Sequence, residues 1–143
     1  MAHTAPLPYR ASTVWVVVAD DAHARVYSRE PRNVIVSRNA RQADEILTWT
    51  LRDLPDVTVI GSDGNNLPLE IADRLNRAHG VGRFDGVIVI APPPWLGDFR
   101  PHLTREARDA VIGELAKDLT KLPRARLLQK IADLLPAREG APL

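Results

Sequence analysis

Two continuous runs of apolar residues restrict the possible folds more than any other feature of the chain. The first is STVWVVVAD at residues 12–20, and the second is FDGVIVIAPPP at residues 84–94. A strand that is apolar at every position is typically buried on both faces, so both runs are expected in the centre of one sheet, next to each other. The three prolines that end the second run cannot donate ladder hydrogen bonds, so the chain must leave the sheet there.

Shorter strand patterns follow the first run. Residues 23–30 and 33–38 alternate apolar and polar residues around a Pro-Arg-Asn turn, which predicts a hairpin. With residues 12–20 these strands would form an antiparallel three-strand meander. Residues 40–54 carry apolar residues at helical spacing and are predicted to form a helix. Residues 56–61 are predicted as a short strand.

The second half of the chain is predicted to be mostly helical. Thr104 is a plausible N-cap, and Pro123 suits the first turn of the last helix. Residues 111–120 fit either a continued helix or a strand, and Gly113 disfavours an unbroken helix. The predicted helices are residues 67–80, a short turn at 95–103, residues 104–111 and residues 123–135.

The length and composition are those of one globular domain. The 143 residues are 45% apolar and 26% charged, which suffices for one core. We expect a single domain at residues 13–135, with a flexible N-terminal arm at 1–12 and a flexible C-terminal tail at 136–143, both lacking hydrophobic periodicity. The net charge of +1 gives no overall electrostatic argument for nucleic acid or an anionic membrane.

The composition also excludes several kinds of site. There are no cysteines, so disulfides and thiolate chemistry are excluded. The histidines have no metal-ligand spacing, and we expect neither a metal nor a cofactor. No apolar run reaches the roughly 20 residues that a membrane span needs. The N-terminus has no hydrophobic signal core, so the predicted location is the cytoplasm.

Three segments together resemble the bacterial host attachment proteins ("protein required for attachment to host cells"). They are WVVVADDAHARVY at residues 15–27, FDGVIVIAPPPWLGDFRPHL at 84–103 and ELAKDLTKLP at 114–123. The resemblance implies a fold related to the middle domain of archaeal and eukaryotic peptide-chain release factors. That fold is ribonuclease H-like α/β, with a mixed five-stranded sheet built from a three-strand meander and two further strands, and flanking helices. It also favours a strand near 111–117.

Two acidic residues end the first predicted strand. Asp20 with Asp21 could bind a metal, as acidic residues do in ribonuclease H-like nucleases, or could form a solvated turn, which the sequence favours. Arg25 lies in the family-like segment and is a further predicted binding residue. Trp95 beside the proline run is either a recognition residue or a cover for the end of the core.

A polar cluster precedes the last helix. Its residues could hold a phosphate with the free N–H groups of that helix, or Thr120 or Asp118 could cap the helix while the lysines are solvated. The sequence favours the cap. The predicted binding residues in this region are Lys117, Asp118, Thr120, Lys121 and Arg124.

These features favour a small non-catalytic binding domain that acts on RNA, the ribosome or a protein partner. The alternatives are a metal-dependent nuclease or other hydrolase centred on Asp20, and an interaction protein of the cell envelope, as the family name implies. The release-factor triplet Gly-Gly-Gln is absent, which disfavours release activity. A homo-oligomer that buries residues 40–61, which include Trp49, is also predicted.

Overall fold

The computed structural model describes residues 13–39, 42–60 and 66–135. The predictions of a flexible arm and a flexible tail therefore lie outside the described residues. The strands are β1 (Val14–Ala19), β2 (His23–Asn39), β3 (Gln42–Asp53), β4 (Val59–Ile60), β5 (Gly86–Ile90) and β6 (Val111–Leu115). The helices are α1 (Leu67–Gly80), α2 (Pro93–Phe99), the 3₁₀ turn η2 (Arg100–His102), α3 (Arg105–Asp109) and α4 (Arg124–Leu134).

The strands form one mixed sheet in the order β3-β2-β1-β5-β6, with β4 paired to the start of β2. Strands β1, β2 and β3 are antiparallel neighbours, whereas β1, β5 and β6 are parallel. The predicted pairing of the two apolar runs is confirmed, as is the strand near residue 111. The single α/β domain with a mixed sheet is also confirmed, while its ribonuclease H-like and release-factor relations stay predictions.

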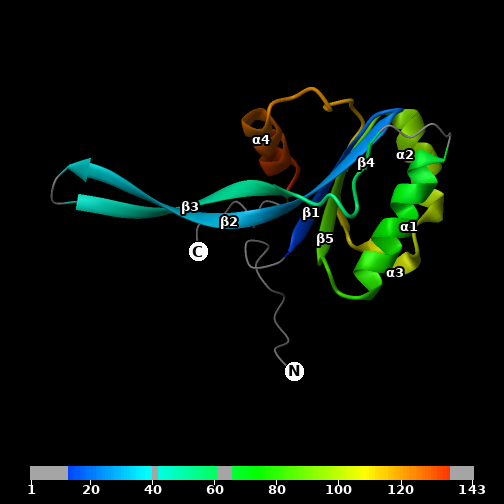
Figure 1. The fold of residues 1–143 in the computed structure, drawn as a ribbon, viewed down its shortest axis with the longest axis horizontal. Coiled ribbons are helices and arrows are strands. Elements are labelled where there is room, and N and C mark those ends of the chain that lie inside the picture. The colour runs from blue at the N-terminus through cyan, green and yellow to red at the C-terminus, as the bar shows by residue number, and fades with distance from the viewer. Residues whose placement is uncertain (1–12, 40–41, 61–65, 136–143) are drawn as a thin grey trace.

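Helices cover both faces of the sheet, with α1, α2 and α3 on one face and α4 on the other (Figure 1). The apolar strand β1 serves both layers, because alternate side chains point to opposite faces. Trp15 and Val17 pack into the α1–α3 layer, whereas Val14 and Val16 pack into the layer that contains Leu127 of α4. This double burial explains why the strand has no polar position. No helix among the described residues is long and apolar enough to cross a membrane.

The meander differs from the prediction in two places. Residues 40–54 were expected to be a helix, but β3 occupies Gln42–Asp53 and pairs with β2 along its whole length. The prediction was wrong because the segment also carries Leu47, Trp49 and Leu51 at period two, and pairing with β2 selects that period. Long-range pairing therefore overrode the local helical pattern.

The predicted turn near residue 32 is also wrong, since β2 continues from His23 to Asn39. Its pairing with β1 ends at Arg29, so Pro31 lies beyond the last β1 partner. A proline is tolerated there because one side of the strand has no partner strand among the described residues. As a result β2 and β3 extend past the helices as a two-stranded ribbon (Figure 1).

Candidate functional site

The parallel strands bring several predicted site residues to one edge of the sheet. Strands β1, β5 and β6 run in the same direction, so the segments that follow them meet at their carboxyl ends. Asp20 follows β1, the helix carrying Trp95 follows β5, and residues 117–120 follow β6. Ligands of parallel α/β sheets commonly bind at this edge, so its polar groups were the first candidates for a site.

The carboxylate of Asp20 is occupied by its own turn. Its Oδ1 accepts hydrogen bonds from the backbone N–H of Ala22 at 2.8 Å and of His23 at 2.7 Å. Partial burial raises the pKa of this carboxyl group, but these two backbone bonds, with the side chains of Thr120 and His23 close by, outweigh the burial and hold the pKa below its ordinary value. Asp20 is thus ionised and acts as the acceptor that closes the β1–β2 turn.

Asp118 and Thr120 form a local turn and do not cap the last helix. The backbone N–H and the hydroxyl of Thr120 both donate to Oδ1 of Asp118, at 3.0 and 2.6 Å. The N-cap of α4 is Pro123, and no side chain caps that end. The predicted cap was wrong because a further turn, Leu119 to Leu122, separates Thr120 from the helix. Thr120 therefore lies between the carboxylates of Asp20 and Asp118.

We call Asp20, Asp118 and Thr120 the strand-end cluster, and the described residues around it show no metal-binding arrangement. Within the ranges that the structure describes, no group of three His, Cys, Asp or Glu side chains is placed to hold a metal ion. Lys117 and Lys121 are exposed, as is Arg25 on β2. Oδ1 of Asp20 already accepts from the β1–β2 turn, and Oδ1 of Asp118 already accepts from Thr120.

Trp95 belongs to the core. Its side chain is 4% exposed and stacks on Phe99 with ring centroids 5.0 Å apart. Its indole Nε1 is buried and has no hydrogen-bond partner among the described residues. Trp95 therefore covers the end of the core, which is the second of its two predicted roles.

Arg124 links α4 to the meander. Its guanidinium group binds both carboxylate oxygens of Asp53, at 2.7 and 2.9 Å, and donates to the carbonyl of Leu51 at 3.0 Å. It also lies over the ring of Tyr27, with the guanidinium carbon 5.4 Å from the centroid. The structure thus separates Arg124 from the strand-end cluster and gives it a partner 71 residues away in the chain.

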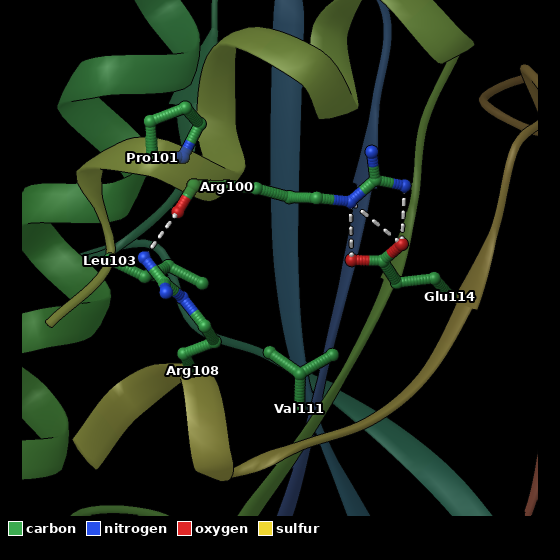
Figure 2. Close-up of a pocket in the computed structure, with 6 residues that line it drawn as sticks. All are labelled: Arg100, Pro101, Leu103, Arg108, Val111 and Glu114. Carbon is green, nitrogen blue, oxygen red and sulfur yellow. Dashed lines mark hydrogen bonds and ion pairs between the residues drawn. The ribbon is translucent and has the colours of Figure 1, made fainter. Parts of the chain in front are cut away.

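A groove beside β6 is the second candidate site (Figure 2). It has a volume of about 540 Å³ and is lined by Arg100, Pro101, Leu103, Arg108, Val111 and Glu114. Arg100 reaches across the groove and binds Glu114 through Nε at 3.0 Å and Nη2 at 2.6 Å. These hydrogen bonds raise the pKa of Arg100. The guanidinium of Arg108 makes one long bond of 3.5 Å, to the carbonyl of Arg100.

None of the six groove residues was a predicted site residue. Arg100 and Glu114 lie in different elements, and their pairing depends on how η2 packs beside the edge of the sheet. The available signal was the strand near 111–117, since a strand at the end of the sheet order exposes one edge. The sequence predicted this strand without its place in the sheet.

A comparison with known protein families gives a match that covers the groove beside β6. Residues 68–131 match the family described as "Protein required for attachment to host cells". This part of the chain is similar to that family. The matched region runs from α1 into α4 and includes the whole β6 groove and residues 117–120. No curated protein shows a significant match to the chain.

The host attachment match confirms the predicted resemblance for this region. Strands β1, β2 and β3 lie outside it. The two candidate sites differ in this respect, because Asp20 of the strand-end cluster precedes the matched residues while every groove residue falls within them. The groove is therefore the candidate site that is contained entirely in the host attachment region.

Proposed function

We propose that this chain is a non-catalytic, host-attachment-related domain that binds an extended segment of a protein partner along β6. The observation that carries the proposal is the position of β6 at one end of the sheet, beside an open groove. Among the described residues, β6 pairs with β5 on one side and with no strand on the other. An exposed edge of this kind can accept a peptide as an added strand.

The groove would supply the specificity. Leu103 and Val111 offer apolar surface, and Arg108 offers a guanidinium group that makes a single long hydrogen bond within the groove. Arg100 is already neutralised by Glu114. A segment with an apolar side chain next to an acidic one fits these groups, because a carboxylate and a guanidinium form paired, charge-assisted hydrogen bonds.

The pairing of the arginines favours a protein partner over RNA. Binding to RNA depends on cations that can neutralise phosphates, whereas six arginines here already bind carboxylates. The pairs are Arg52–Glu30, Arg74–Glu70, Arg77–Asp73, Arg83–Asp56, Arg100–Glu114 and Arg124–Asp53. A phosphate that bound at one of these six arginines would have to displace its carboxylate, while a peptide can use the edge of β6 without doing so.

Peptide selection tests the proposal. The full chain is used to select from a library of random 12-residue peptides, and the affinity of selected peptides is measured by fluorescence anisotropy. We expect acidic and apolar residues to be enriched. Arg108→Glu should weaken binding at least tenfold, since it places a carboxylate against a carboxylate. The matched control is Arg105→Glu, which reverses an exposed charge on the same helix outside the groove.

Three results would contradict the proposal. They are the absence of any enriched peptide, equal weakening by both charge reversals, and salt-dependent binding of a labelled 20-nucleotide RNA that is tighter than binding of every peptide. The last result would support the RNA alternative. Cytoplasmic location stays a prediction, and cell fractionation tests it.

A further inference from the structure

The Arg100–Glu114 ion pair occupies part of the groove beside β6. The carboxylate of Glu114 accepts from Arg100 Nε at 3.0 and 3.1 Å and from Nη2 at 2.6 Å. Figure 2 shows that the side chain of Arg100 extends across the groove to reach Glu114. Arginine binds the carboxylates of ligands with the same two-point geometry. Glu114 therefore already fills the position that an acidic side chain of a ligand would take at Arg100.

The second arginine of the groove, Arg108, has no carboxylate partner among the described residues. Its guanidinium donates one long hydrogen bond, of 3.5 Å, to the carbonyl of Arg100. A ligand carboxylate can bind Arg108 without displacing another carboxylate, whereas at Arg100 it must compete with Glu114. The competition is unequal, because Glu114 belongs to the same chain and so has a high effective concentration at Arg100.

The open edge of β6 brings a bound segment directly to this ion pair. The carbonyl of Leu115 accepts from the N–H of Ala91, which follows β5, at 3.1 Å. Backbone N–H and C=O groups of successive strand residues point to opposite sides, so those of Glu114 point to the open side. A residue of an added strand that pairs with Glu114 has its side chain on the same face of the sheet. That side chain lies next to the Arg100–Glu114 pair.

We propose that Glu114 is an internal competitor for acidic ligands, which keeps anions away from Arg100 and limits a bound segment to one acidic side chain, the one at Arg108. The residue of the segment that pairs with Glu114 is then selected to be neutral. The inference rests on the proposed function for the bound peptide, whereas the exclusion of anions from Arg100 concerns the groove alone.

Glu114→Gln makes the position at Arg100 available to a ligand. The variant keeps the size of the side chain and leaves the charge of Arg100 without a carboxylate. The side chains of Arg100 and Glu114 are 53% and 28% exposed, and exposed ion pairs contribute little to stability, so the variant should fold. A segment with a second acidic residue should bind it about fivefold more tightly than the native chain, through one added exposed ion pair. Arg100→Gln combined with Glu114→Gln should abolish this gain.

Inorganic phosphate tests the exclusion of anions without any peptide. The side-chain Nε–H signals of the arginines are followed by NMR while phosphate is added to millimolar concentration. In the native chain the Arg108 signal should shift and the Arg100 signal should not, because Glu114 holds the Arg100 Nε–H. In Glu114→Gln both signals should shift. The matched control is Asp109→Asn, which removes an exposed carboxylate outside the groove lining and should behave like the native chain.

Peptide selection tests the consequence for the ligand. The same peptide library is used with the native chain and with Glu114→Gln. Peptides selected on the native chain should carry one acidic residue, and those selected on Glu114→Gln should carry two. Fluorescence anisotropy then measures each selected peptide on both chains and on the double variant with Arg100→Gln.

The two measurements separate failure of this inference from failure of the proposed function. Equal phosphate shifts of the Arg100 signal in the native chain and in Glu114→Gln would overturn the inference, even when peptides bind the native chain as proposed. Selected peptides of equal acidic content, or a gain in affinity that Asp109→Asn shares, would overturn it as well. If no peptide binds either chain, but phosphate shifts the Arg100 signal in Glu114→Gln alone, the proposed function fails and the role of Glu114 as a competitor for anions is supported.

Discussion

Replacement of Asp20 should destabilise the fold, because its carboxylate accepts the hydrogen bonds that close the β1–β2 turn. Asp20→Ala removes the acceptor of the Ala22 and His23 N–H groups. Hydrogen bonds to a charged group contribute about 1.5–3 kcal/mol each when buried. The site is only partly buried and its 26% exposed side chain lets water replace part of the loss, so we expect about 2 kcal/mol in total.

Asp20→Asn measures the contribution of the carboxylate charge separately from the contribution of the hydrogen-bond acceptor. The amide oxygen of asparagine can still accept from both N–H groups, but charge-assisted bonds are roughly twice as strong as neutral ones. We therefore expect Asp20→Asn to cost about 1 kcal/mol, half the cost of the alanine variant. Asp21→Asn is the matched control, because Asp21 is the exposed neighbour and should change stability by less than about 0.5 kcal/mol.

The pH dependence provides a second measurement. The pKa of Asp20 in the folded protein lies below its ordinary value of 3.8, because the hydrogen bonds outweigh partial burial. A lowered folded pKa contributes stability above the unfolded pKa, and this contribution is lost as the pH falls through the folded pKa. The stability difference between the native chain and Asp20→Asn should thus be constant near pH 7 and shrink below about pH 4.

Urea unfolding followed by tryptophan fluorescence measures these differences, since Trp15 and Trp95 are buried and should report unfolding. A loss of 1 kcal/mol corresponds to roughly 3 °C in the melting temperature for a domain of this size. The reasoning would be refuted by an alanine variant as stable as the native chain. An asparagine variant that is less stable than the alanine variant would refute it as well.

Three further predictions concern the core and the helix ends. Val89→Asp should prevent folding, because Val89 is fully buried in β5 and an unpaired buried carboxylate costs several kcal/mol; a soluble variant with a cooperative thermal transition would contradict this. Thr104→Ala should lower the free energy of unfolding in urea by about 1 kcal/mol, since the Thr104 hydroxyl accepts from Ala107 N–H at 3.1 Å as the cap of α3. Thr120→Ala should lower it by about half as much or less, because Thr120 caps no helix. Equal losses for the two variants would contradict this difference between the two threonines. Arg124→Ala should lower stability by about 1 kcal/mol or less through the loss of its pair with Asp53, while Lys121→Ala, at an exposed position, should leave stability unchanged. Melting temperatures measure both effects, and a larger decrease for Lys121→Ala than for Arg124→Ala would contradict the prediction.

The centre of the fold could be predicted from the sequence alone. Residues 14–19 and 87–91 are apolar at every position, which burial between two layers satisfies. The cap at Thr104 was likewise readable, because a helix N-terminus needs an acceptor within three residues and the threonine supplies it locally. In both cases the information lies within one short segment.

Tertiary structure decided the segments whose sequence permits two periods. Residues 42–53 carry apolar residues at both helical and strand spacing, and the choice was made by pairing with β2 over its whole length. The sequence could not show that β2 continues through Pro31, since this depends on where β1 ends beside it. Local propensity is weak compared with a ladder of backbone hydrogen bonds and the packing of Leu51 against α4.

The candidate sites depend even more on distant contacts. Asp20 and Thr120 lie 100 residues apart in the numbering, and they meet because β1 and β6 run parallel on either side of β5. Arg100 meets Glu114 because η2 packs beside the edge strand β6. The spacing of charged surface residues in the sequence does not predict which residues pair. Only the folded arrangement of the elements determines which carboxylate each arginine binds.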